Sequence, residues 1–284
     1  MSATRTDRPP SLRSLEQRID NIAHREARPV RRIQRAVANT VIGQMLPAGV
    51  IRGGTAMKLR LGDAASRFTP DLDVIRSADL SLDAYLGELE DRLVAGWSGF
   101  TGTLRPLPPP QPEDVPTDYI MRPFEIRLAY KGRHWLPVTF ELGRDEIGST
   151  GRRDLRVADD IVRLFVALGL EMPDPVPVLT VGHQIAQKLH ACTSVNPKTG
   201  GNDRAHDLVD LQILIDDEEV DLAAVGMTAR RLFASRRGQP WPPTVVAHDG
   251  WDTIYAKAAD GLDVIENVGD AVTWANELIG RIES

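Results

Sequence analysis

The sequence contains a single cysteine, Cys192, among its 284 residues. One cysteine cannot form an internal disulfide, and it cannot supply the several thiolates of a cysteine-based zinc site. No apolar run reaches the roughly 18 residues that a membrane-spanning helix needs. The opening stretch, MSATRTDRPPSLRS, has no apolar segment and does not form a secretory signal. These absences predict a cytoplasmic protein without a membrane partner.

The sequence also lacks an overall excess of positive charge. Its formal net charge of −6 argues against a general nucleic-acid binder. The distribution is uneven, however. Residues 1–60 hold twelve Lys and Arg against four Asp and Glu, a net +8, which leaves −14 for the remainder. This basic segment could meet a phosphate backbone or an acidic partner protein, or it could be an arginine-rich helix face in water.

The most informative stretch is 50–75, VIRGGTAMKLRLGDAASRFTPDLDVI. Gly53, Gly54 and Thr55 follow an apolar pair and open a segment with helical spacing. Backbone N–H groups at a helix N-terminus form a cradle for phosphate. Asp71 and Asp73 come later, and in a strand they point to the same side. Mg²⁺ prefers one or two carboxylates together with substrate phosphates, so the pair predicts a metal site.

Each half of this pattern has a simpler interpretation. A Gly-Gly pair is most often a tight turn, and two alternating aspartates on a strand are most often a solvated face. The two halves in this order, with apolar flanks, favour metal-dependent chemistry on a nucleotide.

The residues GGTAMKLRLG and RFTPDLDVI resemble the nucleotidyltransferase signature of the AbiEii-type toxins, a branch of the DNA polymerase β-like superfamily that includes the MenT toxins. Fifteen residues separate Thr55 from Asp71, which is longer than the minimal superfamily pattern and similar to this branch. Arg67 and Thr69 match its lead-in to the first aspartate. The resemblance implies nucleotide binding by Gly53, Gly54, Thr55 and Arg67, with Asp71 and Asp73 as catalytic metal ligands.

A second pattern lies in the helical half of the chain, where QKLHACT is followed by a polar loop and RAHDLVDL. It resembles the second block of the AbiEii-type toxins, in which a lysine precedes an Asp-Leu-x-Asp-Leu helix. The resemblance makes Lys188 a catalytic residue that contacts the incoming triphosphate. Asp207 and Asp210 lie three apart on one helix face. On this resemblance both are catalytic candidates, one of which would orient Lys188 or join the active-site network, and spacing does not decide which. The simpler alternative is a carboxylate at the helix N-terminus for Asp207 and a surface ion pair for Asp210.

The superfamily also places a third acidic residue on a neighbouring strand, and Glu141 is the candidate for a third metal ligand, ahead of Asp145 and Glu146. Thr69 stands two residues before Asp71, so its hydroxyl would face the metal site on an extended segment. Some antitoxins of this branch resemble kinases, which makes Thr69 a candidate regulatory phosphorylation site. The simpler interpretation is a hydroxyl that only stabilises the turn before Pro70.

The resemblance implies an enzyme that uses Mg²⁺ or Mn²⁺ to transfer NMP from an NTP and releases pyrophosphate. It implies the toxin of a bacterial toxin–antitoxin pair, with an antitoxin protein as partner and a tRNA 3′ end as acceptor. The alternatives are nucleotidylation of a protein or small molecule, and an inactive relative that only binds. The intact motifs weigh against the last of these.

The expected fold is α/β, a polymerase β-like mixed sheet with flanking helices and a helical C-terminal half. The expected domains are a disordered tail at 1–11, a nucleotidyltransferase core at 12–150 and a helical domain at 151–284. Helices are predicted from residue 12 and over 30–46, 54–61, 80–94, 158–170, 182–193, 204–216, 222–234, 250–259 and 264–282. Strands are predicted at 50–51, 71–75, 124–130 and 135–142, and a proline-rich spacer at 106–117.

Overall fold

The computed structural model describes residues 7–109, 120–195, 200–217, 220–236 and 239–284. It divides into two compact units, which are described one at a time. The first unit comprises Met1–Ala64 and Phe68–Val178, and the second comprises Ala65–Arg67 and Leu179–Ser284. The sequence placed the division after residue 150, whereas the first unit continues to Val178.

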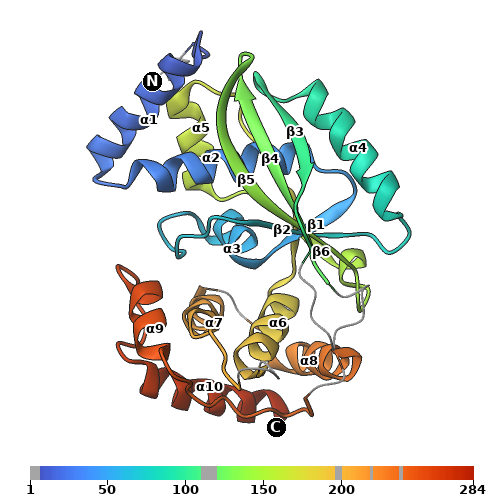
Figure 1. The fold of residues 1–284 in the computed structure, drawn as a ribbon. Helices are drawn as coiled ribbons and strands as arrows, with labels where there is room; N and C mark the ends of the chain where they lie inside the picture. The colour runs from blue at the N-terminus through green and yellow to red at the C-terminus, as the bar shows by residue number, and fades with distance from the viewer. Residues whose placement is uncertain (1–6, 110–119, 196–199, 218–219, 237–238) are drawn as a thin grey trace. The chain divides into compact units, whose positions relative to one another are not determined.

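The first unit is built around one mixed sheet, which contains seven strands in the described part of the chain (Figure 1). Its strands are β1 (Gly49–Arg52), β2 (Leu72–Arg76), β3 (Phe100–Pro106), β4 (Arg122–Tyr130), β5 (Arg133–Arg144), β6 (Arg153–Arg156) and β7 (Val176–Leu179). Its helices are α1 (Leu12–Glu26), α2 (Val30–Gln44), α3 (Gly53–Leu61), α4 (Leu82–Ala95) and α5 (Asp159–Leu168). The short 3₁₀ turn η2 (Ser149–Gly151) precedes β6.

The strand order is β3-β4-β5-β2-β1-β7-β6. Strand β2 lies between β1, to which it is antiparallel, and β5, to which it is parallel. The carboxylate-bearing strand is therefore central, with neighbours that fix its position on both sides. Helix α4 packs on β3, and Figure 1 shows it on the opposite side of the strands from α1, α2 and α5. The layered arrangement buries the apolar core between helices and sheet.

The β4–β5 hairpin follows the alternation that the sequence shows. Phe124, Ile126, Leu128 and Tyr130 are buried, and the residues between them are more exposed. Lys131 has a φ of 49° and Gly132 a φ of 75°, the left-handed pair that a two-residue hairpin turn needs. The predicted hairpin is confirmed, and it carries β5 back beside β2.

Three strands were missed by the sequence analysis. Strand β3 contains Gly102, and a methyl group there would lie 2.9 Å from Leu93 on α4, so the glycine allows close helix packing. Strand β7 contains Pro177, which favours a loop in sequence terms, yet Val178 pairs with Ile51 of β1. Because β6 and β7 join the sheet, the second half of the chain is not all helical as expected.

Of the tail predicted at 1–11, residues 1–6 lie outside the described part, and residues 7–11 are mostly exposed, with only Pro9 buried. The carbonyl of Pro9 accepts a hydrogen bond of 2.7 Å from the buried Tyr130 hydroxyl. The carbonyl of Asp7 accepts one from Arg18. Ser11 then caps α1 by accepting from the Ser14 amide at 3.2 Å. The spacer predicted at 106–117 also falls partly outside the described residues.

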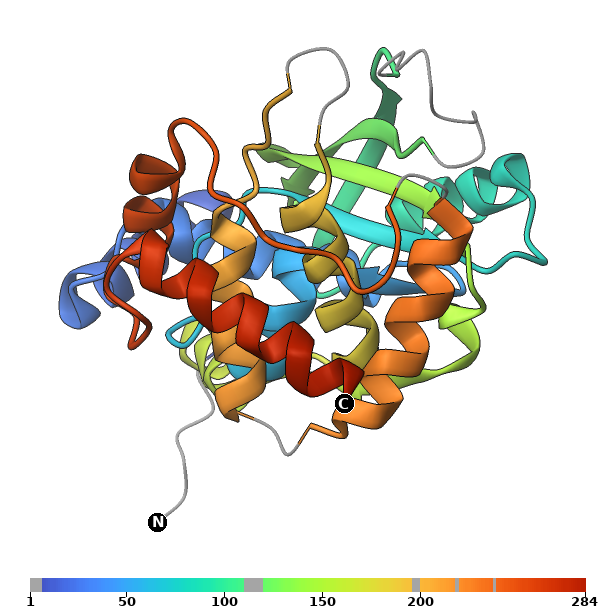
Figure 2. The same ribbon diagram turned by 90° about the horizontal axis from the view of Figure 1, so that it is seen from below.

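The second unit contains helices α6 (Val181–Thr193), α7 (His206–Asp217), α8 (Leu222–Arg236), α9 (Trp251–Ala259) and α10 (Val268–Glu283). Helix α6 packs on α7 and α8, while α10 packs on α7, α8 and α9. Figure 2 shows α10 in red lying across this group. Of the helices described, none combines the length and apolar character that crossing a membrane requires.

Candidate active site

The predicted carboxylates of the first unit lie at the start of β2. The strand begins at Leu72, so Asp71 immediately precedes it, and Asp73 lies on the side opposite to the fully buried Leu72. The sheet register pairs Asp73 with Glu141 of β5 on one side and with Arg52 of β1 on the other. Residues paired in this way share a face, so Glu141 lies beside Asp73.

Asp145, the first acidic residue after β5, is placed differently from Glu141. Asp145 accepts hydrogen bonds from the Ser149 and Thr150 amides at 2.8 Å and 2.7 Å and from both hydroxyls. Burial alone would raise the pKa of Asp145, but these donors hold it below its usual value. Asp145 therefore stabilises its own loop, and the acidic residue that lies beside Asp73 in the sheet is Glu141.

Gly53 allows the N-terminus of α3 to approach Asp73. Its φ of 64° is left-handed, and a methyl group at this position would overlap the Asp73 carboxylate. Asp73 consequently lies at the positive end of the α3 dipole. Because Gly53 has no side chain, the predicted phosphate-binding helix N-terminus can lie next to the predicted metal ligand Asp73.

Thr55 is buried, with 2% exposure, and its hydroxyl holds the backbone in front of β2. It donates to the Asp71 carbonyl at 2.8 Å and accepts from the Asn39 side chain at 2.9 Å. Asn39 also reaches the Asp71 carbonyl at 3.3 Å. The sequence analysis missed Asn39, although a polar residue on the apolar face of a helix (AVANTVIG) was a signal that it has a buried partner.

Thr69 is buried against α3, with 7% exposure. A methyl group on Gly54 would lie 2.8 Å from the Thr69 Cβ and 2.9 Å from its Oγ1. Gly54 therefore provides room for Thr69, in addition to any contact of its amide with a ligand. A phosphate on Thr69 requires this contact to open.

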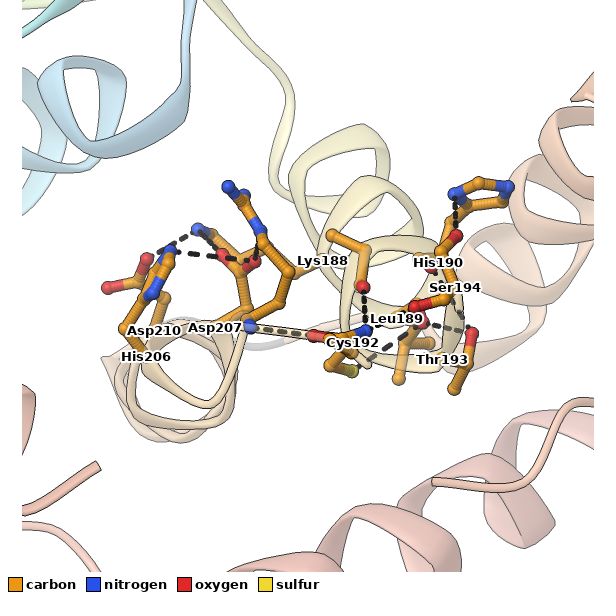
Figure 3. A network of polar contacts seen from close by, with 12 residues as sticks. Lys188, Leu189, His190, Cys192, Thr193, Ser194, His206, Asp207 and Asp210 are labelled. Atoms are coloured by element: carbon orange, nitrogen blue, oxygen red, sulfur yellow. Dashed lines mark hydrogen bonds and ion pairs between the residues drawn. The ribbon is translucent and has the colours of Figure 1, made fainter. Parts of the chain in front are cut away.

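The predicted residues of the second unit form one ion cluster, which Figure 3 shows between α6 and α7. The Lys188 Nζ lies 2.6 Å from an Asp210 oxygen and 3.1 Å from an Asp207 oxygen. Asp207 and Asp210 are 1% and 0% exposed. Both aspartates therefore contact Lys188, and which of them is essential stays a prediction.

Two arginines complete this cluster. Arg67 donates to both oxygens of Asp210, with its Nε at 2.9 Å and 3.0 Å, and Arg204 donates from Nε to Asp207 at 2.8 Å. Three cations thus surround two carboxylates, which gives the cluster a net charge of +1. The sequence predicted Arg67 as a nucleotide ligand, and its position in this cluster was not foreseen.

The cations keep both carboxylates ionised. Burial alone would raise the pKa of Asp207 and Asp210, but Lys188 lowers the pKa of both, helped by Arg204 at Asp207 and by Arg67 at Asp210. His206 lies next to Asp207, and burial lowers its pKa to about 4 despite the attraction of that carboxylate. Both carboxylates therefore remain ionised at neutral pH.

His190 lies on α6 but belongs to a separate packing group. Its ring packs edge-on to Phe233 at 5.0 Å, and the Arg236 Nη1 donates to its Nδ1 at 3.3 Å. Burial, followed by the charge of Arg236, lowers the pKa of His190 to about 3. The histidine is neutral in the folded protein at pH values where an unfolded chain protonates it.

This shift predicts a loss of stability in mild acid. An unfolded histidine titrates near pH 6.5, so below that pH the unfolded state binds more protons and stability falls toward pH 4. We expect His190 to account for about 1 to 2 kcal/mol of unfolding free energy lost between pH 7 and 5. Urea unfolding of His190→Gln should show a correspondingly weaker pH dependence. His24→Gln, at an exposed site on α1, is the control, and an equal change in both variants would contradict the prediction.

Across the described residues, no three His, Cys, Asp or Glu side chains are grouped closely enough to bind a metal ion by themselves. The role of Asp71, Asp73 and Glu141 as metal ligands therefore stays a prediction. Carboxylate oxygens are the hard ligands that Mg²⁺ takes, and that ion commonly relies on substrate phosphates for its other ligands.

Comparison with known proteins identifies the family. The family model described as "Nucleotidyl transferase AbiEii toxin, Type IV TA system" matches residues 43–270, which is most of the chain. Among solved structures, the chain is similar to "MenT4, nucleotidyltransferase toxin Rv2826c from Mycobacterium tuberculosis H37Rv". That match has a TM-score of 0.51 and 16% identity, and it covers 95% of this chain and 99% of that one. At this identity the likeness concerns the fold, and it confirms the predicted fold class. No curated protein matches the sequence.

Proposed function

Since the chain belongs to the AbiEii family of nucleotidyltransferase toxins of type IV toxin–antitoxin systems, we propose that it transfers NMP from an NTP to the 3′ end of an RNA, and that this RNA is tRNA. The observation that carries the proposal is the row formed by Asp73 and Glu141, with Gly53 at the N-terminus of α3 against Asp73. It combines acidic ligands with a helix N-terminus that suits a triphosphate.

The residues at this row fit a divalent cation. The Asp73 and Glu141 side chains start from paired positions, and Asp71 lies one residue before the strand. We propose that Asp71 and Asp73 hold Mg²⁺ or Mn²⁺ and that Glu141 assists. A divalent ion held by these carboxylates would supply the Lewis-acid chemistry that NMP transfer needs, which favours ionisation of the acceptor hydroxyl and departure of pyrophosphate.

The other residues of the first unit position these groups. The amides of Gly53 and Gly54 would donate to the triphosphate at the positive end of α3. Thr55 and Asn39 hold the Asp71 carbonyl, which fixes the backbone from which the Asp71 carboxylate projects. In this proposal Thr55 acts on the metal ligand rather than on phosphate directly.

For the second unit we propose a role in the use of the NTP. Lys188 and Arg67 carry the positive charge that a triphosphate needs, and the two buried aspartates keep both side chains in fixed positions. Asp207 and Asp210 act through these cations as positioning residues. The cluster supplies more positive than negative charge, which suits an anionic ligand.

The acceptor screen tests this proposal. The protein is incubated with Mg²⁺, total RNA and each α-labelled NTP in turn, and parallel reactions contain protein extract or small metabolites in place of RNA. We expect label in an RNA of tRNA size. Label that enters only protein or a small molecule would support the alternative acceptors and overturn the RNA assignment. A full lack of metal-dependent NTP binding would indicate an inactive relative.

The family implies an antitoxin partner, and we propose Thr69 as a site where modification would switch the enzyme off. Phosphate would add about −1.5 to −2 charge beside Asp71. We expect Thr69→Glu to lose most transfer activity and Thr69→Val to retain it.

Because Thr69 is buried against Gly54, the larger side chain of glutamate could inhibit transfer by its size alone. Thr69→Gln, which has the same size without the charge, is the matched control. Stronger inhibition by Glu than by Gln supports a charge effect. Equal inhibition by both would reduce Thr69 to a packing residue, and full activity of Thr69→Glu would remove it from the site.

A further inference from the structure

Helix α2 and the turn before it carry four arginines that divide into two pairs. Arg28 and Arg32 both contact the buried carboxylate of Asp63, with the Arg32 Nε at 2.9 Å, and Lys58 lies 2.5 Å from the same group. Asp63 is 1% exposed. Arg28 and Arg32 therefore stabilise the fold by neutralising the buried Asp63 carboxylate.

Arg31 and Arg35 form the second pair, and no carboxylate lies within ion-pair distance of either in the described residues. Arg31 is exposed, with its Cζ 5.7 Å from the centre of the Phe68 ring. Arg35 is half-buried, and its Nη1 donates to the Pro137 carbonyl at 2.9 Å. Both guanidinium groups are thus held in place while keeping donors for a ligand.

This pair is aligned with the candidate metal ligand. Arg31, Arg35 and Asn39 are spaced by four residues, so they lie on one face of α2. The last of them contacts the Asp71 carbonyl at 3.3 Å. Electrostatics agree, because burial and the charge of Arg31 lower the pKa of Arg35 while Asp71 opposes the shift. The helix face therefore leads from an exposed arginine to Asp71.

We propose that Arg31 and Arg35 bind neighbouring backbone phosphates of the acceptor strand and thereby bring its terminal hydroxyl to Asp71. The two arginines are one helical turn apart, about 6 Å along the axis, which is comparable with the spacing of phosphates on one strand. Guanidinium groups bind phosphate through paired donors without reading bases. This inference rests on the proposed RNA acceptor and adds where it binds.

The acceptor and the triphosphate would occupy different sides of the carboxylate pair. Gly53 and the α3 N-terminus approach Asp73, whereas the Arg31–Arg35 face approaches Asp71. In this proposal, part of the excess positive charge of residues 1–60 binds the phosphates of the acceptor strand. An acidic segment of the antitoxin could use the same charges, and the experiment separates the two ligands.

The test measures binding of a labelled single-stranded RNA with a free 3′ hydroxyl, by fluorescence anisotropy over a salt series, and the KM for RNA and NTP in transfer. The variant is Arg31→Gln with Arg35→Gln. The control is Arg13→Gln with Arg163→Gln, which removes two exposed arginines from α1 and α5 of the same unit. Thermal unfolding checks that both variants fold.

We expect the Arg31/Arg35 variant to bind RNA about tenfold or more weakly, with a salt slope smaller by about 1.4 because two phosphate contacts are lost. The KM for RNA should rise and the KM for NTP should not. Equal RNA binding by variant and control would overturn the inference, and so would a rise confined to the KM for NTP. Reduced inhibition by the antitoxin with unchanged RNA binding would make this a protein-docking face instead.

Failure of the proposed function gives a different result. If the wild-type protein modified no RNA, the RNA transfer assignment would fall, while the anisotropy comparison would still decide whether the two arginines bind phosphates. If the wild-type protein modified RNA and both double variants did so equally well, only the present inference would fall.

Discussion

Replacing Asp73 by asparagine should reduce nucleotide transfer by more than about a hundredfold, since even outer partners of metal ligands typically change activity by about 10- to 100-fold. Asp71→Asn should have the same effect. Each substitution keeps the side-chain shape and removes one of two neighbouring negative charges, so the unfolding free energy should change little. Steady-state transfer of labelled NTP and thermal unfolding measure the two effects separately.

The matched control for this pair is Asp79→Asn, which removes an exposed carboxylate from the loop after β2. It should transfer at the wild-type rate. A second readout is the stabilisation of the protein by Mg²⁺ with NTP, which Asp73→Asn should lose. Near-normal Mg²⁺-dependent turnover in Asp71→Asn and Asp73→Asn would contradict the proposal that these aspartates bind the metal.

Lys188→Met should lose both transfer activity and stability. Its removal leaves Asp207 and Asp210 buried with only one arginine each, and breaking a buried ion pair in this way costs about 3 kcal/mol or more. Lys188→Arg should be rescued only in part, because a planar guanidinium does not occupy the position of an ammonium. Urea unfolding and the KM for NTP are the measurements.

The stability effect must be separated from the chemical one. The double variant Lys188→Met with Asp207→Asn also neutralises one of the two buried carboxylates that lose their lysine, so it should regain part of the stability that Lys188→Met loses. It should not regain transfer activity. A double variant that recovers both would make Lys188 a structural lysine and contradict its proposed role with the triphosphate.

The local geometry of the candidate site could be predicted from the sequence, because the spacing of its residues follows from secondary structure. A Gly-Gly pair before a helix and two aspartates around a buried leucine need only secondary structure to be interpreted. The hairpin alternation in β4 and β5 likewise indicated that Glu141 lies on a strand. Its partner in the sheet, Asp73, could not be derived from spacing, because the pairing of β5 with β2 joins residues far apart in the chain.

The remaining features depend on tertiary packing. Asn39, Thr55 and the Asp71 carbonyl come from three separate segments, so their hydrogen bonds have no local signature. The burial of Thr69 against Gly54 is likewise a consequence of packing. Arg67 precedes the first aspartate in sequence and was predicted with the nucleotide ligands, yet its partner is Asp210, which the second pattern supplied.

The central claim, transfer of NMP to an RNA 3′ end, is tested most directly by the position of the label. Purified tRNA is incubated with the protein, Mg²⁺ and NTP labelled at either the α or the γ phosphate, before and after periodate oxidation of the RNA 3′ end. The account predicts that α label enters intact RNA, that γ label does not, and that oxidised RNA accepts neither. Label that enters oxidised RNA, or γ label that enters any RNA, would contradict it.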